Sequence, residues 1–252
     1  MKVAGCTAIV TGGNRGIGEA FVHGLIRAGA EKVYVGSRTL EAAAHLESQY
    51  PGQAIAVELD VTNESQVQAA AQKCGDTSVV INNAGVHQDA TLIGAPDLNA
   101  ARTEMEVNYF GVLSMCRHFA PVLATNSGGA IVNVLSVAGI VAVPAMGGYS
   151  PSKFASRALT TKLRAELADQ NTQVSSLIVG SVDTRMAAQV QGRKESPDTI
   201  AKAGIKAIEK NIPEMDTDAF AINVRAAIAR DPAHVERQMA AMLKAETLST
   251  GR

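Results

Sequence analysis

The sequence predicts an α/β protein, a single domain in which helices cover both faces of a doubly wound parallel sheet of six to seven strands. Three observations predict this class. Short apolar, β-branched runs alternate with helical patterns along most of the chain. The glycine-rich stretch TGGNRGIG, at residues 11–18, follows the first of these runs and opens the first helical pattern. A chain of 252 residues with 46% hydrophobic residues is long enough to bury a substantial core.

The first strand of the predicted sheet contains Val3, Ala4 and the apolar residues 8–10. Five further runs are rich in branched apolar residues, which is typical of strands that are buried on both faces. They cover residues 32–37, 54–59, 78–82, 130–135 and 173–179. Helical patterns fill the gaps, and the clearest cover residues 18–28, 97–123 and 149–168. A seventh strand has no clear apolar pattern, and its best candidate is residues 212–215.

The sequence becomes polar after about residue 185, as in QVQGRKESPDT at residues 189–199. This change indicates a mobile substrate lid over residues 185–200. A tail with helical patterns at residues 200–209, 220–229 and 235–245 follows. The tail is too short to form a unit of its own, so the sequence predicts one domain over residues 1–252.

Charge and composition exclude several classes of protein. The net charge is −1 and no long block of like charge occurs, so neither nucleic acid nor an anionic membrane surface is an expected partner. We expect a cytoplasmic protein, because no apolar run is long enough to span a bilayer and no signal-peptide cleavage pattern occurs. Cys6, Cys74 and Cys116 lie far apart, and no spacing of histidines, cysteines or carboxylates predicts a metal site. The expected partner is therefore a small molecule.

The glycine-rich stretch predicts a phosphate-binding loop. Gly12, Gly16 and Gly18 do not fit the usual G-x-G-x-x-G fingerprint, and the Lys-Ser/Thr pair of the Walker loop is missing. A glycine turn that opens a helix nevertheless presents free backbone N–H groups and the positive end of the helix dipole, which suit a pyrophosphate. A tightly packed strand-to-helix junction without a ligand is the alternative, since such junctions also favour glycine.

The end of the second predicted strand indicates which dinucleotide the loop would bind. A site for NAD carries an acidic residue near this point for the ribose 2′-hydroxyl, whereas this chain has Ser37 and Arg38. Arg38, together with Arg15 in the glycine loop, favours a 2′-phosphate and hence NADP, because charge-assisted contacts of this kind are strong. An ordinary surface arginine is the alternative.

Tyr149 and Lys153 form the second candidate site. They are four residues apart at the start of a predicted helix and therefore share a face. The lysine ammonium and a cationic nicotinamide would both lower the phenol pKa from its ordinary value of about 10 and so make Tyr149 a usable proton donor. Ser136 ends the preceding strand, where its hydroxyl would hold a substrate carbonyl oxygen. An exposed helical pair without a function is the alternative.

These residues resemble the short-chain dehydrogenase/reductase (SDR) family, in its NADP-preferring subgroup of about this length. The match covers residues 3–184 and includes TGGNRGIG, NNAG at residues 82–85, a serine thirteen positions before the tyrosine, and YSPSK at residues 149–153. The resemblance implies a Rossmann-type fold and hydride transfer between NADP(H) and a carbonyl or alcohol, as in a carbonyl reductase. It also implies a homodimer or homotetramer.

The resemblance implies a role for each matching residue. Tyr149 is the expected acid–base, Ser136 orients the substrate oxygen and Lys153 binds the nicotinamide ribose. Asn108 is expected to kink its helix and to hold a water that links Lys153 to solvent in a proton relay. With the glycine loop and the NADP determinants included, the expected cofactor-binding residues are Gly12, Asn14, Arg15, Gly16, Ile17, Gly18, Ser37, Arg38, Asp60, Val61, Asn83, Ala84, Gly85, Tyr149, Lys153, Val182 and Thr184.

The chain departs from the family pattern at one position. Val179 stands before Gly180 where the family usually has proline, which predicts a looser turn after the sixth strand. Two alternatives to a reductase share this scaffold. One is a catalytically silent NADP-binding regulatory protein, for which a damaged set of catalytic residues would be expected. The other is an epimerase or dehydratase, for which a longer carboxyl-terminal region would be expected.

Overall fold

The computed structural model describes residues 1–250, with the side chains of Met242 and residues 244–250 left out. Its centre is a seven-stranded sheet in the order β3-β2-β1-β4-β5-β6-β7, and all neighbouring strands are parallel. The strands are β1 (Thr7–Thr11), β2 (Lys32–Ser37), β3 (Ala54–Glu58), β4 (Val79–Asn82), β5 (Gly129–Val134), β6 (Thr172–Ile178) and β7 (Glu214–Asp216). The predicted doubly wound α/β class is confirmed. The strand order reverses between β1 and β4, where the carboxyl ends of the strands open into a crevice.

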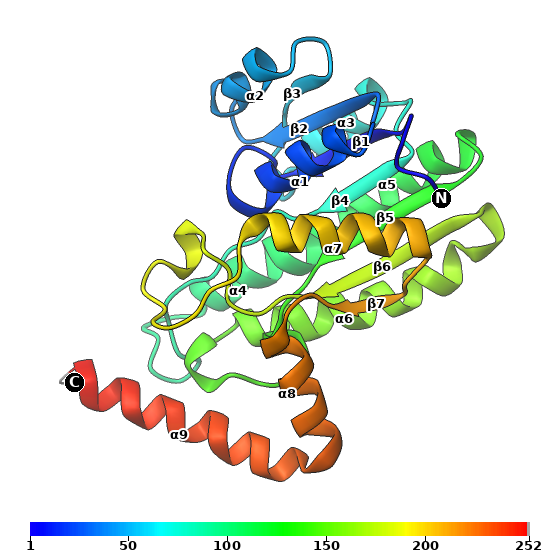
Figure 1. Ribbon diagram of the computed structural model, residues 1–252. Coiled ribbons are helices and arrows are strands. Elements are labelled where there is room, and N and C mark those ends of the chain that lie inside the picture. Colours follow the sequence, from blue (N-terminus) through cyan, green and yellow to red (C-terminus); the bar gives the residue numbers. More distant parts are fainter. Residues whose placement is uncertain (251–252) are drawn as a thin grey trace.

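Helices cover the two faces of the sheet (Figure 1). The helices of the described chain are α1 (Gly16–Arg27), α2 (Ala44–Gln49), α3 (Glu64–Lys73), α4 (Asn99–Met105), α5 (Val112–Thr125), α6 (Tyr149–Glu166), α7 (Pro197–Lys210), α8 (Ala219–Arg230) and α9 (Pro232–Thr250). Successive residues of β1 point to opposite faces, so Val10 joins one core with α1 and α7, and Ile9 joins the other with α3, α5 and α6. Both faces of the sheet are buried, as the apolar runs predict.

Three boundaries differ from the sequence-based expectation. The first strand begins at Thr7 and not at Val3, because residues 3–5 form a turn in which Gly5 has φ +79°. The helix expected over residues 97–123 begins at Asn99 and changes to a π-helical segment, η2 (Glu106–Gly111), before α5. The seventh strand occupies residues 214–216, so the candidate at residues 212–215 overlaps it by two residues.

The carboxyl-terminal elements pack near the end of β6. Ser196 caps α7 by accepting a hydrogen bond from the Thr199 N–H at 3.2 Å, so most of the expected lid precedes this helix. Val235 and Met239 of α9 pack against Val141 and Val143, which precede Tyr149 in the chain. The rest of α9 extends away from the sheet (Figure 1). Within the described part of the chain, no helix combines the length and the apolar character that crossing a membrane requires.

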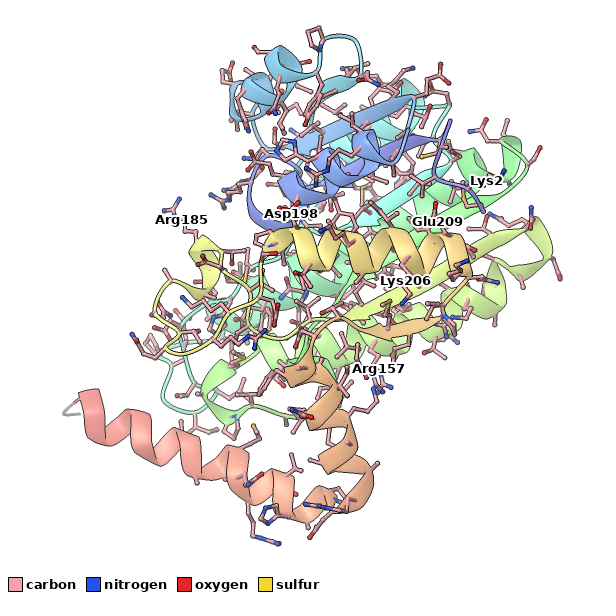
Figure 2. The ribbon with its side chains drawn as sticks, viewed as in Figure 1. Lys2, Arg157, Arg185, Asp198, Lys206 and Glu209 are labelled. Atoms are coloured by element: carbon pink, nitrogen blue, oxygen red, sulfur yellow. The ribbon has the colours of Figure 1, made fainter. Side chains whose placement is uncertain are left out.

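Ion pairs fasten the edge strand β7, which has few apolar residues. Arg157 of α6 donates to the Glu214 carboxylate at 2.8 and 2.9 Å, and Figure 2 shows this arginine beside the β7 edge. Arg225 of α8 binds Asp216 at 2.6 and 2.7 Å. These bidentate pairs attach α6 and α8 to the last strand of the sheet.

Candidate active site

The glycine loop connects β1 to α1 at the reversal of strand order. Gly12 and Gly16 have φ values of +60° and +57°, a region that favours glycine. Gly18 is buried, and a Cβ at this position would collide with the Gly12 carbonyl oxygen. The loop therefore brings its backbone close to any bound group without side chains in between, and the α1 amino terminus points into the crevice, which fits a pyrophosphate.

The segment after β4 is bonded directly to this loop. The Asn83 side chain donates to the carbonyls of Thr11 and Gly12 at 2.9 and 3.2 Å. The Thr11 hydroxyl accepts hydrogen bonds from the N–H groups of Asn83 and Ala84 at 3.0 and 2.9 Å. The expected cofactor residues at 12 and 83–84 thus form one connected wall of the crevice, next to Gly85.

The residues expected around the adenosine end lie at the ends of β2 and β3. Ser37 is buried, and its hydroxyl donates to the Thr39 carbonyl at 2.6 Å. Arg15 and Arg38 are exposed, and neither takes part in an ion pair between described residues. Asp60 accepts two hydrogen bonds from Thr62, at 2.9 and 2.7 Å. Both guanidinium groups are therefore available to an anion.

Asn14, Ile17 and Val61 complete this part of the expected cofactor set. Ile17 is partly buried and packs against the core on the α1 side of the sheet, and Asn14 is half-buried in the loop. Val61 is buried against Gly111, where an added Cβ would lie 2.7 Å from a valine methyl group. Val61 therefore contacts the helix that carries Asn108.

Three elements bring the expected catalytic residues together. Ser136 follows β5, Tyr149 and Lys153 lie on the first two turns of α6, and Asn108 lies on η2. The Lys153 ammonium donates to the Val134 carbonyl at 3.1 Å and lies 5.5 Å from the centroid of the Tyr149 ring. A Cβ on Gly85 would lie 3.2 Å from Asn108 Oδ1 and 3.7 Å from Lys153 Nζ, so both groups face the segment after β4.

Hydrogen bonds fix Asn108 on all sides. Its amide accepts from the Val86 N–H and donates to the Val86 carbonyl, both at 2.9 Å, and donates to the Ser152 hydroxyl at 3.0 Å. Its backbone carbonyl accepts a hydrogen bond from the Ser156 hydroxyl at 2.5 Å. A side-chain donor at a helix carbonyl competes with the backbone ladder, which accounts for the π-helical turn at this point.

Burial dominates the proton affinities of the pair on α6. It raises the pKa of Tyr149 to about 12, against the opposing effect of the Ser136 hydroxyl, and the nearby Glu104 carboxylate raises this pKa further. Burial lowers the pKa of Lys153 to about 8. Without the cofactor, the phenol pKa of Tyr149 therefore lies above its ordinary value, because burial disfavours the phenolate. The lowering expected from the lysine ammonium and a cationic nicotinamide together stays a prediction.

The segment after β6 approaches the glycine loop. Thr184 lies against Gly16, where an added Cβ would be 3.3 Å from the threonine methyl group. Val182 is buried and forms a bridge with Glu195. The turn before it is not loose, because the Gly180 N–H donates to the buried Asp218 carboxylate at 2.8 Å. Asp218 thus ties this turn to α8, although Val179 replaces the usual proline.

Sequence reasoning missed two polar residues beside Tyr149. Glu104 is fully buried on α4, and His87 lies with its ring centroid 5.2 Å from that of Tyr149 in an edge-to-face contact. The ring nitrogen Nε2 of His87 is buried. Glu104 lies one helical turn before Asn108, and this spacing was the only available signal that its side chain points inward.

Comparisons with known proteins agree with this geometry. The sequence profile of the short chain dehydrogenase family matches residues 6–195. A crystal structure of a short chain dehydrogenase from Burkholderia cenocepacia in complex with NADP has 39% sequence identity and a TM-score of 0.90, over 95% of this chain and 99% of that one.

Two further relatives are more distant. A gluconate 5-dehydrogenase from the same organism, in complex with NADP and tartrate, has 26% identity and a TM-score of 0.78, over 85% of this chain and 94% of that one. The rhamnolipids biosynthesis 3-oxoacyl-[acyl-carrier-protein] reductase of Pseudomonas aeruginosa is 31% identical over 75% of this chain and 78% of its own length. The chain therefore belongs to the short chain dehydrogenase family of NAD(P)-dependent oxidoreductases.

Proposed function

We propose that the protein is an NADPH-dependent carbonyl reductase, which transfers a hydride between the nicotinamide and a ketone or aldehyde, or the corresponding alcohol. The observation that carries the proposal is the convergence of Asn108, Ser136, Tyr149 and Lys153 next to the glycine loop. A binding protein without catalysis would not need a proton donor, a lysine and an oxygen-binding hydroxyl at one point.

NADP(H) is the cofactor that the residues fit. The glycine loop would hold the pyrophosphate, and the exposed guanidinium groups of Arg15 and Arg38 would hold the 2′-phosphate beside Ser37. Asn83, Ala84 and Gly85 would support the riboses, and Asp60 and Val61 would flank the adenine. Val182 and Thr184 would meet the carboxamide. When bound, the reduced cofactor supplies the hydride.

The side chains of the protein supply the remaining chemistry. Ser136 donates a hydrogen bond to the substrate carbonyl oxygen and so stabilises the negative charge that develops there. The Tyr149 phenol gives its proton to that oxygen in reduction, and its phenolate accepts a proton from the alcohol in oxidation. The Lys153 ammonium stabilises the phenolate. Asn108, which Val86 and Ser152 hold in place, would bind the water that returns a proton by way of Lys153.

The first test replaces the proton donor. Tyr149→Phe keeps the ring and removes the hydroxyl, so we expect turnover to fall at least about 100-fold, the range of a lost general acid. We expect the Kd for NADPH, measured by fluorescence titration, to stay within a few-fold of the wild-type value. The substrate is any ketone or aldehyde that the wild-type protein reduces.

Tyr50→Phe is the matched control, because Tyr50 lies away from the site and its hydroxyl contacts His23 at 2.9 Å. The control should retain turnover. Activity in Tyr149→Phe equal to that of the control would contradict the proposed role of Tyr149.

A further inference from the structure

Glu104 is a buried carboxyl group that the proposed reaction does not use. It lies in the last turns of α4, and none of its surface is exposed. A carboxylate in such a position is costly unless it is hydrogen-bonded or paired. The contacts of the Glu104 carboxyl group therefore indicate its role in the active site.

The two carboxyl oxygens join two segments of the active site. Oε1 accepts a hydrogen bond from the Gln88 N–H at 2.7 Å, in the segment that follows β4. Oε2 lies against Gly148, where an added Cβ would be only 2.8 Å away. Gly148 is the residue directly before Tyr149 at the start of α6. The carboxyl group therefore connects the segment after β4 to the beginning of the helix that carries Tyr149 and Lys153.

His87 completes this polar wall. Its ring contacts the Tyr149 ring edge to face, with centroids 5.2 Å apart and an interplanar angle of 66°. His87 Nε2 and Glu104 Oε2 are both buried, and neither forms a hydrogen bond with another described residue. An imidazole in contact with the Tyr149 ring and a carboxyl group that acts on its pKa therefore each keep one polar atom unused by the fold.

The charge of Glu104 acts on the phenol. Burial raises the pKa of Glu104 above its ordinary value, and attraction to His87 opposes this shift. Once ionised, Glu104 raises the pKa of Tyr149. The titratable groups that face Glu104 are His87 from the segment after β4 and Tyr149 from α6, and Lys153 Nζ lies over the Tyr149 ring, 5.5 Å from its centroid. In its ionised form, the Glu104 carboxylate favours the protonated phenol.

We propose that Glu104 is a positioning residue for Tyr149, which braces the start of α6 against the segment after β4 and places a buried carboxyl group near the phenol that donates its proton when a carbonyl is reduced. The inference rests on the proposed reductase function. It predicts a site biased towards carbonyl reduction, because reduction needs the phenol and oxidation needs the phenolate.

Two substitutions distinguish the effect of the Glu104 charge from the effect of its contacts with Gln88 and Gly148. Glu104→Gln keeps the size and the acceptor for Gln88 but removes the charge, so the pKa of Tyr149 should fall. We expect the alkaline limb of the kcat profile for carbonyl reduction to move to lower pH by about half a unit or more, which is the scale of a nearby charge in a protein. Glu104→Asp keeps the charge but shortens the reach, so kcat should fall while the limb stays near its wild-type position.

Glu106→Gln is the matched control, because Glu106 is two residues away and exposed. Its profile should coincide with that of the wild-type protein. The Kd for NADPH should be unchanged in all variants, and thermal unfolding identifies any variant that fails to fold. The inference would be overturned if the alkaline limb of the kcat profile of Glu104→Gln coincided with that of Glu106→Gln.

A second measurement does not depend on turnover. The phenolate absorbance of the NADP⁺-bound protein is followed against pH, with Tyr149→Phe as the blank, in wild type and Glu104→Gln. A shift to lower pH in a protein that reduces no carbonyl would support the role of Glu104 while the proposed function fails. Normal turnover without a shift would overturn the role of Glu104 alone.

Discussion

At the scale of single residues, Arg38 is the residue that we propose determines the choice between NADP and NAD. Its guanidinium is exposed at the end of β2 and pairs with no carboxylate among the described residues. Ser37 beside it is uncharged, unlike the acidic residue of an NAD site, and its hydroxyl donates to the Thr39 carbonyl. The position is therefore prepared for an anion and not for a ribose 2′-hydroxyl.

Arg38→Asp should reverse this preference. A charge-assisted phosphate contact is worth about 1.5 to 3 kcal/mol, so its loss should raise the Kd for NADPH by one to two orders of magnitude. The Kd for NADH should stay the same or fall, since an acidic residue at this place suits the 2′-hydroxyl. Titration of both cofactors measures the ratio.

Arg237→Asp, an equal change of charge at an exposed position of α9, is the control and should leave the ratio unchanged. If the ratio in Arg38→Asp matched that of the control, Arg38 would be an ordinary surface residue.

Within the site, some residues could be predicted from the sequence and others could not. Tyr149 and Lys153 could be singled out because their spacing of four on one helix is a local property, although only the family resemblance favoured a catalytic pair over an exposed one. Glu104 and His87 were not, because their importance depends on α4 and the segment after β4 meeting the start of α6. A buried carboxylate looks like an ordinary helical glutamate until that contact is known.

At the scale of elements, η2 depends on a contact that crosses the fold. The sequence predicts one continuous helix through this region, and the family resemblance alone implied a kink at Asn108. The Ser156 hydroxyl, 48 residues further along the chain, binds the Asn108 carbonyl and removes it from the helical ladder. No local pattern shows this bond, so the kink was not predictable from helix propensity.

The turn after β6 depends on Asp218 in the same way. One carboxyl oxygen accepts from Gly180 N–H at 2.8 Å, and the other caps α8 by accepting from Ala221 N–H at 2.9 Å. This turn leads to Val182 and Thr184, the expected contacts of the nicotinamide carboxamide. Asp218 therefore supports both α8 and the turn that leads to the expected lid.

Asp218→Ala should weaken both the cap of α8 and the turn after β6. Loss of a helix cap costs about 1 kcal/mol, and a buried N–H group without an acceptor costs about 1 to 3 kcal/mol more, so the free energy of unfolding should fall by about 2 to 4 kcal/mol. The Kd for NADPH should also rise severalfold. Chemical denaturation and cofactor titration measure the two effects.

Asp231→Ala is the control, because Asp231 accepts from the His234 N–H at 2.9 Å in an exposed position far from the turn. It should destabilise the protein less and leave cofactor affinity unchanged. A wild-type affinity in Asp218→Ala would show that Asp218 does not support the cofactor-binding turn.

At the scale of the whole molecule, the sheet was predictable because its inner strands are apolar on both faces. Val10, Ile81 and Ile131 are fully buried, and the runs that contain them match β1, β4 and β5 within a few residues. The edge strand β7 was not predictable, because its three residues, Glu214 to Asp216, are held by Arg157 and Arg225 and not by an apolar pattern.

The association of copies of the chain stays a prediction. Phe110 and Phe154 are 48% and 40% exposed, on η2 and α6, and these two elements are linked by the bond from Ser156 to Asn108. Exposed aromatic side chains on adjoining elements favour an interface between subunits. The proposed homodimer or homotetramer would bury them across a two-fold axis.

The most direct test of the proposed function is the loss of reduced-nicotinamide absorbance when the purified protein is mixed with NADPH and a panel of ketones and aldehydes, with NADH in parallel. We predict tight binding of NADPH, turnover of at least one carbonyl, and lower activity with NADH. Tight binding without turnover on the whole panel would contradict the reductase and favour a cofactor-binding regulatory protein. Failure to bind either cofactor would contradict the assignment of the glycine loop itself.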